Sequence, residues 1–256
     1  MALAVEEHGG PAGETIVLVH GFSQNARCWG PLLPALAAHR RVLAVDAPGH
    51  GDSPPHHDAA GFAEAAALLG QAGGRGTYVG YSMGGRLCLQ LACTRPDLVE
   101  RLVLIGATPG LPDAAARATR RAADSKLAAR LLDIGLARFL DEWLALPLFA
   151  GLSPAAQARP ERLRNRPEGL AASLRHCGTG NQEPLWEHLP SLPMAVLALA
   201  GAEDHKFAAI ARRISELAPS STVALVAGAG HTAHLEQPAA ATELIVAWLD
   251  AHPAPG

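Results

Sequence analysis

Six short apolar runs, each about as long as a β-strand, constrain most strongly what this chain can fold into. They cover residues 15–19, 42–45, 77–79, 102–105, 195–199 and 223–226. Gly, Pro or Asp bound the runs, and several are almost continuously apolar and rich in β-branched residues, as parallel strands covered on both faces are. Helical stretches lie between them, notably at residues 84–93 and 239–251. Alternating strands and helices predict a mostly parallel, doubly wound α/β sheet.

The alternation stops between residues 108 and 190. This stretch is rich in Ala, Arg and Leu and holds helical patterns but no convincing strand, and strand character returns at Met194. We therefore expect an α/β core formed by residues 1–107 and 191–256, interrupted by a helical cap insertion at residues 108–190. A separate all-helical second domain is the alternative, and the return to strands favours the insertion.

The composition argues against several functional classes and several kinds of partner. With 256 residues, 49% of them apolar and 18% charged, the chain has the balance of a compact folded protein. The net charge of -3 gives no reason to expect nucleic acid or an anionic membrane surface as a partner. Residues 1–7 are too short and too acidic for a signal peptide, and no apolar run reaches the length of a membrane span. We expect a cytoplasmic protein without membrane insertion.

The four cysteines predict neither a disulfide framework nor a metal site. Cys28, Cys88, Cys93 and Cys177 form no CxxC pair and no His/Cys ligand spacing. Cys88 and Cys93 fall in a helical pattern, where they would serve as small buried apolar residues. We expect neither a metal nor an organic cofactor.

A Gly-Tyr-Ser-Met-Gly pentapeptide at residues 80–84 matches the pattern G-x-S-x-G, between a strand and a helical run. Small residues suit a sharp strand-to-helix turn, because side chains at either glycine would clash there. The turn lifts the Ser82 hydroxyl clear of the sheet, and the helix N-terminus behind it favours developing negative charge. The pattern predicts that Ser82 is a nucleophile, and the alternative is a chance match in a chain with 26 glycines.

A reactive serine needs a general base, and the base needs an orienting carboxylate. Asp204 follows the fifth apolar run and His231 follows the last one. Both would meet the serine where the carboxyl ends of parallel strands gather. We therefore predict Ser82, Asp204 and His231 as catalytic residues, with Glu203 as the rival acid and His234 as the rival base.

The turn after the first apolar run predicts an oxyanion hole. Gly21 would allow close approach of the backbone to a substrate oxygen. The backbone N–H groups of Phe22 and of Met83, which follows the nucleophile, would then stabilise negative charge on that oxygen. An ordinary strand-end turn is the alternative interpretation.

Several segments together resemble a known family over essentially the whole chain. They are His-Gly-Phe at 20–22, Pro-Gly-His-Gly-Asp-Ser at 48–53, Gly-Tyr-Ser-Met-Gly-Gly-Arg at 80–86, and the motifs at 139–149, 201–207 and 230–234. The chain resembles the α/β-hydrolase superfamily, and within it the family of 2-succinyl-6-hydroxy-2,4-cyclohexadiene-1-carboxylate synthases of the menaquinone pathway. This resemblance implies an α/β-hydrolase fold and a carbon–oxygen lyase that eliminates pyruvate from a small anionic cyclohexene carboxylate. It leaves open whether the protein is a monomer or a homo-oligomer.

The resemblance also implies side chains that bind the substrate. Arginine binds carboxylates through two parallel hydrogen bonds, and Arg86 lies one helical turn after Ser82. Arg120 and Arg164 match cap arginines of the family. Neighbouring arginines at 117, 121, 162 and 166 could take their places. The implied set is Tyr81, Arg86, Arg120, Trp143, Arg164 and Lys206, whereas residues 178–181 belong to a motif-like segment for which no role follows.

Three functions remain open from the sequence. The preferred one is proton abstraction from a substrate carbon by the Ser82 oxygen, activated by His231, without an acyl-enzyme. The main rival is a serine hydrolase, acting on an ester, a thioester or a C–C bond through an acyl-enzyme. The third is a non-catalytic binding protein built on the same scaffold. The family resemblance also allows a cofactor-free haloperoxidase activity, which can be incidental to an accessible triad.

Overall fold

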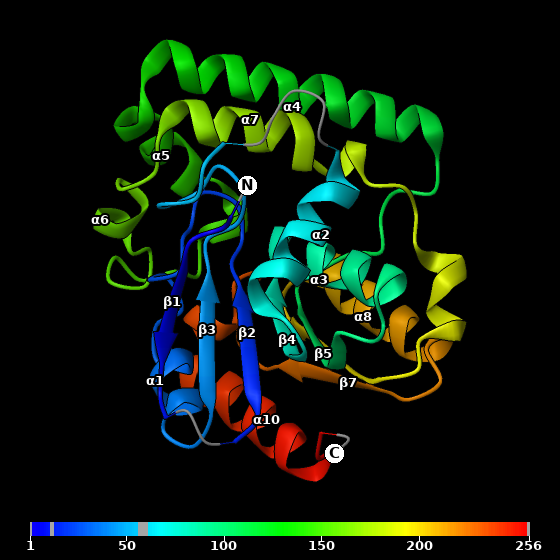
Figure 1. Cartoon of the computed structure of the whole chain (residues 1–256). Coiled ribbons are helices and arrows are strands. Elements are labelled where there is room, and N and C mark those ends of the chain that lie inside the picture. Colours follow the sequence, from blue (N-terminus) through cyan, green and yellow to red (C-terminus); the bar gives the residue numbers. More distant parts are fainter. Residues whose placement is uncertain (1, 11–12, 56–60, 255–256) are drawn as a thin grey trace.

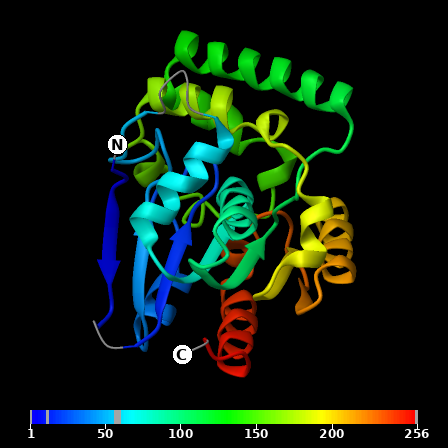
Figure 2. The same ribbon diagram turned by 45° about the vertical axis from the view of Figure 1, so that its right-hand side comes forward.

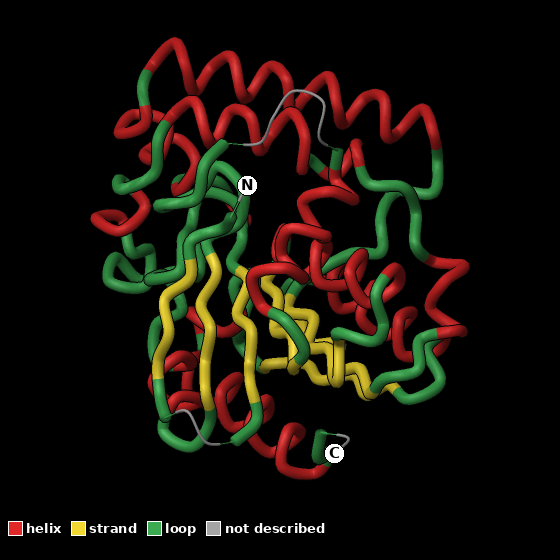
Figure 3. The backbone as a smooth tube through the Cα atoms, in the orientation of Figure 1, coloured by secondary structure: helices red, strands yellow, loops and turns green. Residues whose placement is uncertain are grey.

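The computed structural model describes residues 2–10, 13–55 and 61–254, and its centre is a single sheet (Figure 1, Figure 3). The strands stand in the order β1-β3-β2-β4-β5-β6-β7. Their bounds are β1 Val5–His8, β2 Thr15–Val19, β3 Arg41–Val45, β4 Gly76–Tyr81, β5 Val99–Ile105, β6 Ala195–Gly201 and β7 Ser221–Val226. β1 pairs antiparallel with β3, and the other neighbouring strands pair in parallel. The mostly parallel sheet predicted from the sequence is confirmed.

Helices cover both faces of the sheet (Figure 1, Figure 2). Leu69, Leu87 and Ile214 pack against one face, whereas Leu36 and Ile245 pack against the other. The helices on the first face are α2 Phe62–Gly73, α3 Met83–Thr94 and α8 His205–Leu217. The helices on the second face are α1 Leu32–Ala37 and α10 Pro238–Ala251, with the short α9 Ala233–Glu236 before α10. This two-sided cover explains why the central strands are nearly all apolar.

Residues 108–190 contain helices and no strand, and we keep the proposed name cap for them. Their elements are α4 Ala114–Ile134, α5 Leu136–Leu144, η1 Pro147–Phe149, α6 Arg159–Arg162, α7 Pro167–Cys177, η2 Thr179–Asn181 and η3 Trp186–Ser191, the last of which ends one residue beyond the cap. α4 and α7 lie side by side over one end of the sheet in both views (Figure 1, Figure 2). Leu131, Phe139, Leu140 and Leu170 form a small apolar core of the cap, against which Phe22 packs.

Two features differ from the sequence-based expectation. The edge strand β1 was not predicted, because Val-Glu-Glu-His is short, charged and only half-buried at the margin of the sheet. β4 extends to Tyr81, so the helix α3 begins at the residue directly after Ser82. Within the described residues, no helix combines the length and the apolar character needed to cross a membrane.

Candidate active site

Ser82 occupies the turn between β4 and α3, and its φ of 50° is in the left-handed region that side chains other than glycine rarely adopt. Packing around the flanking glycines holds this strained turn. A Cβ on Gly84 would lie 1.9 Å from the carbonyl oxygen of Val19, and one on Gly80 would lie 2.5 Å from the Cα of Gly85. Only glycine fits at both positions, which is the local reason for the G-x-S-x-G pattern.

The structure brings Ser82, His231 and Asp204 into one hydrogen-bonded chain, the candidate triad. The Oγ of Ser82 lies 3.1 Å from Nε2 of His231, and Nδ1 of His231 lies 2.8 Å from Oδ2 of Asp204. The His231 side chain is 4% exposed and that of Asp204 is 11% exposed. This geometry is suited to transfer a proton from the serine to the imidazole while the carboxylate orients the ring.

Asp204 also caps the helix α8, because its Oδ1 accepts a hydrogen bond from the N–H of Phe207. Burial raises the pKa of the Asp204 carboxyl. The hydrogen bonds from His231 and from the Phe207 N–H outweigh burial, so the pKa lies below its usual value. The carboxyl is therefore ionised at neutral pH and can stabilise a protonated His231.

Glu236 is a functional candidate that the sequence analysis missed. Its carboxylate accepts hydrogen bonds from the N–H of Gly230, at 2.7 Å, and from the N–H of Thr232, at 2.8 Å. These two residues flank His231, so Glu236 fixes the loop that carries the imidazole. The signal in the sequence is a carboxylate a few residues beyond the histidine in the same turn.

The two rivals of the triad residues lie elsewhere. His234 is buried between the rings of Tyr81 and Trp29, whose centroids are 4.7 Å and 5.3 Å away, and neither of its ring nitrogens has a hydrogen-bond partner within the described residues. Burial lowers the pKa of His234 to about 3, so the ring is neutral. Glu203 is exposed, and Asp204 rather than Glu203 contacts His231.

Phe22 and Met83 both line the cavity in front of Ser82. Met83 is the first residue of α3, so its N–H has no acceptor within the helix. Phe22 follows Gly21, where a Cβ would lie 2.6 Å from the ring of Tyr81. Glycine at 21 therefore lets the loop pass close to the ring of Tyr81, the residue before Ser82.

The cavity has a volume of about 250 Å³ and is lined from both the core and the cap. Besides the candidate triad, it is lined by four cationic side chains, whereas Asp204 is the one carboxylate among its described lining residues. The four cations are Arg86, Arg120, Arg162 and Lys206. The site therefore favours an anionic ligand.

Arg86 and Arg162 are the two buried cations of the cavity, 6% and 1% exposed. Arg86 donates to the carbonyl oxygen of Cys177 at 2.7 Å and to Oε1 of Gln182 at 3.4 Å, and its guanidinium lies 5.1 Å from the centre of the Phe62 ring. Burial lowers the pKa of Arg86 to about 10 and also lowers that of Arg162. Within the part of the chain that the structure describes, neither guanidinium forms a salt bridge with a carboxylate.

The other two cations lie nearer the solvent. The Nε of Arg120 donates to both carboxylate oxygens of Asp124, at 2.9 Å and 3.0 Å, and the Arg120 side chain is 45% exposed. Lys206 is exposed, with its Nζ 5.4 Å from the centre of the Phe207 ring. Both can add positive charge at the rim of the cavity.

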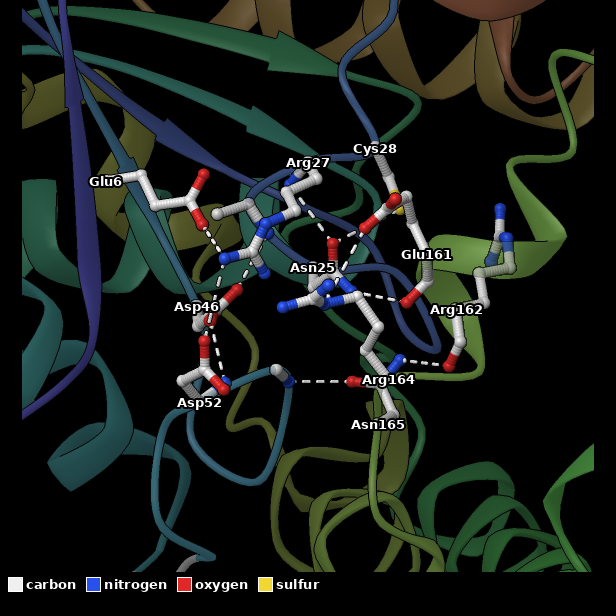
Figure 4. Close-up of polar contacts among 12 residues, drawn as sticks. Glu6, Asn25, Arg27, Cys28, Asp46, Asp52, Glu161, Arg162, Arg164 and Asn165 are labelled. Atoms are coloured by element: carbon white, nitrogen blue, oxygen red, sulfur yellow. Dashed lines mark hydrogen bonds and ion pairs between the residues drawn. The ribbon is translucent and has the colours of Figure 1, made fainter.

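The structure does not bring Arg164 into the cavity; Arg162 lies there instead. The Arg164 side chain is 51% exposed, and its Nε lies 3.7 Å from Oε2 of Glu161. Figure 4 shows the guanidinium groups of Arg162 and Arg164 extending in different directions from the same cap segment. The Nη1 of Arg162 donates to Oγ of Ser23 at 2.6 Å, and this contact orients the side chain that the sequence could not single out.

The two aromatic candidates also line the cavity. The hydroxyl of Tyr81 lies 3.0 Å from Oγ1 of Thr232, and burial raises the pKa of Tyr81 above its usual range, so the hydroxyl stays neutral. Trp143 packs edge-on against Phe22, with ring centroids 5.2 Å apart. The Trp143 Nε1–H is buried without a partner among the described residues.

The described residues contain no group of three or more His, Cys, Asp or Glu side chains that could hold a metal ion.

Comparisons with known proteins agree with this fold. Residues 16–243 match the alpha/beta hydrolase family. A 2-succinyl-6-hydroxy-2,4-cyclohexadiene-1-carboxylate synthase of Salmonella heidelberg (strain SL476) is 34% identical over 90% of this chain and 92% of its own. The structure of MenH from S. aureus superimposes with a TM-score of 0.88 at 30% identity, over 96% of this chain and 98% of its own. A malate-bound thermophilic esterase from Thermogutta terrifontis has a TM-score of 0.83 at 25% identity, over 98% and 94% of the two chains.

The family match covers most of the chain, and the curated synthase and the MenH structure match it almost from end to end. The chain therefore belongs to the α/β hydrolase family, as an enzyme of the group that contains the 2-succinyl-6-hydroxy-2,4-cyclohexadiene-1-carboxylate synthases.

Proposed function

We propose that this enzyme is a cytoplasmic carbon–oxygen lyase of menaquinone biosynthesis that eliminates pyruvate from an anionic cyclohexene carboxylate. The observation that carries this proposal is the pair of buried guanidinium groups, Arg86 and Arg162, which line the same cavity as Ser82 without a salt bridge to any described carboxylate. Burying an uncompensated charge is costly. A substrate with several carboxylates would supply the ion pairs that both guanidinium groups lack, and the names of the synthase relatives agree with such a substrate.

In the proposed reaction, Ser82 acts as a base. Its Oγ takes a proton from a substrate carbon while Nε2 of His231 takes the hydroxyl proton, across the 3.1 Å contact. Asp204, ionised beside Nδ1, stabilises the imidazolium that forms. The electron pair of the broken C–H bond forms a new double bond, the carbon–oxygen bond to the leaving group breaks, and the proton on His231 goes to the departing pyruvate.

The remaining cavity residues would stabilise the anion between these steps. The N–H groups of Phe22 and Met83 would donate to the oxygen on which negative charge develops. Arg86 and Arg162 would bind substrate carboxylates, with Arg120 and Lys206 at the rim of the site and Trp143 along its wall. We propose Arg162, in place of Arg164, as the third arginine of the substrate site.

The test of this proposal is to incubate the protein with the cyclohexene substrate and to follow pyruvate release together with the intact mass of the protein. We expect pyruvate release without any mass increase, because Ser82 relays a proton and forms no covalent bond. The Ser82→Ala variant should release no pyruvate yet still bind the substrate. Absence of pyruvate release from the unmodified protein would refute the lyase function.

Hydrolysis through an acyl-enzyme is the second candidate function. The nucleophile, base and acid stand in the geometry that acyl transfer requires, and the likeness to the malate-bound esterase supports a carboxylate-bearing ester as substrate. In that case an aryl ester would be turned over rapidly with an initial burst, and the mass of the protein would rise by one acyl group.

A further inference from the structure

Ser23, directly after Phe22, is buried and strained. Its φ is 65°, in the left-handed region where a residue with a side chain persists only when its surroundings hold it. All three polar groups of Ser23 are engaged. Its N–H donates to Nε2 of His50 at 3.3 Å, its Oγ accepts from Nη1 of Arg162 at 2.6 Å, and its carbonyl oxygen accepts from Nδ2 of Asn165 at 2.9 Å. Two of these three partners belong to the cap.

Asn165 connects three segments of the chain and is 4% exposed. Its Nδ2 donates to the carbonyl oxygens of Ser23 and Arg162, both at 2.9 Å, and its Oδ1 accepts from the N–H of Gly51 at 2.7 Å. Figure 4 shows Asn165 on the cap segment that also carries Arg162, facing the loops of the core. Every polar atom of the amide therefore has a partner, so no other side chain of similar size can replace it without loss.

His50 supplies the core side of the same arrangement. Its Nδ1 lies 3.1 Å from the carbonyl oxygen of Pro48, so the neutral ring that carries its hydrogen on Nδ1 donates there and leaves Nε2 free to accept from Ser23. Burial lowers the pKa of His50 well below its usual value, which keeps this neutral form at physiological pH. The ring also contacts Phe22 edge-on, with centroids 5.7 Å apart.

We propose that Asn165 is a positioning residue, which together with Arg162 and His50 fixes Ser23 and so aims the Phe22 N–H at the reacting oxygen. The inference rests on the proposed use of the Phe22 and Met83 N–H groups as an oxyanion hole. Phe22 itself is held from the cap side, since its ring also contacts Phe139 at 6.4 Å between centroids. The Phe22 half of the proposed oxyanion hole is therefore held by the cap as well as by His50, whereas the Met83 N–H lies at the start of the core helix α3.

Asn165→Asp tests this inference, because it keeps the acceptor for Gly51 but replaces the donor to Ser23 with an oxygen. Asn25→Asp is the matched control. Asn25 is equally buried, and its Nδ2 donates across the same junction to the Glu161 carbonyl oxygen at 2.7 Å, but its side chain forms no hydrogen bond with Ser23. The pair Asn165→Ala and Asn25→Ala repeats the comparison without a new charge.

Three measurements are needed for each variant: the rate at which a fluorophosphonate labels Ser82, read by intact mass, the kcat and KM of pyruvate release, and the Tm. We expect Asn165→Asp to slow labelling about tenfold or more and to lower kcat similarly with KM nearly unchanged. Asn25→Asp should lower the Tm comparably and leave labelling and kcat within about twofold.

Equal labelling rates in the two asparagine variants, or an Asn165→Asp variant labelled as fast as the unmodified protein, would overturn the inference. Failure of the unmodified protein to be labelled at all would also overturn it, because no oxyanion site would then be formed. Labelling does not involve the cyclohexene substrate. A protein that is labelled but releases no pyruvate would therefore refute the proposed lyase function, while the labelling rates would still decide the role of Asn165.

Discussion

Replacing Arg162 with methionine should weaken catalysis far more than the same change at Arg164, two residues away. Arg162 is 1% exposed and lines the cavity, whereas the Arg164 side chain is 51% exposed and outside it. A carboxylate about 4 Å from a guanidinium gains about 4 kcal/mol at an effective dielectric constant near 20. Desolvation and side-chain ordering offset part of this, and truncating one partner of a buried charge pair costs about 2–5 kcal/mol.

For Arg162→Met we therefore expect the bound transition state to lose about 2–3 kcal/mol of stabilisation, which is a loss of roughly 30- to 150-fold in kcat/KM. For Arg164→Met we expect less than about twofold, because exposed ion pairs such as that with Glu161 contribute little. Initial rates of pyruvate release over a range of substrate concentrations give kcat/KM for both variants. Arg162→Lys keeps the charge but not the paired hydrogen bonds, so its kcat/KM should lie between those of the Arg162→Met and Arg164→Met variants.

The binding of a non-reactive cyclohexene dicarboxylate, measured by calorimetry, separates the charge of Arg162 from its contact with Ser23. Loss of the charge should weaken this equilibrium binding by a similar factor, whereas a displaced Ser23 alone would lower kcat and leave binding intact. Equal effects of the Arg162 and Arg164 substitutions, or unchanged binding in Arg162→Met, would refute the assignment of Arg162 as a carboxylate-binding residue.

Three further substitutions have defined outcomes. Burial lowers the pKa of His234 in the folded protein to about 3, whereas a histidine in the unfolded chain has a pKa of about 6.5. As the pH falls below about 6.5, the unfolded chain therefore binds the proton first, and the free energy of unfolding decreases. His234→Phe should reduce by about 2 kcal/mol the decrease in unfolding free energy between pH 6.5 and 4.5, measured by urea unfolding, and an unchanged pH dependence would contradict this. Glu236→Gln should loosen the His231 loop and lower kcat about tenfold with KM unchanged, whereas a change in KM alone would place Glu236 in binding. Asp204→Asn should lower kcat on the order of a thousandfold or more in steady-state assays, because the imidazole loses its orienting charge, and a loss below tenfold would argue against the triad.

The strands and the candidate triad were predictable because local patterns determine them. Ser82, Asp204 and His231 each follow an apolar run, and parallel strands bring their carboxyl ends to one edge. The chain order of the three residues then follows from the order of the runs. β1 escaped prediction because a four-residue edge strand with two glutamates carries neither an apolar run nor a clear alternation.

The choice among the cap arginines could not be made from the sequence. Arg162 and Arg164 lie within one turn of backbone, and α6 is only four residues long, so no periodic pattern fixes its rotation. The rotation depends on distant contacts, such as the Ser23 hydroxyl, and on Ala158, whose φ of 48° starts the helix from a left-handed residue. Glu236 escaped notice for a similar reason, because its partners are backbone N–H groups, which a sequence does not distinguish.

The two buried arginines connect the cap and the core, one donating from the core to the cap and the other from the cap to the core. Arg86 belongs to α3 of the core and donates to the Cys177 carbonyl oxygen in the cap, whereas Arg162 belongs to the cap and donates to Ser23 of the core. Any separation of cap and core would break both contacts and move one cation away from Ser82. Neither guanidinium forms an ion pair with a described carboxylate, although the nearby Asp124 carboxylate favours the charged form of Arg86, and burial lowers the pKa of both arginines. A substrate whose carboxylates contact both arginines, as proposed above, would offset that cost only while cap and core are in contact. Substrate binding and the contact between cap and core would then stabilise each other by the same free energy.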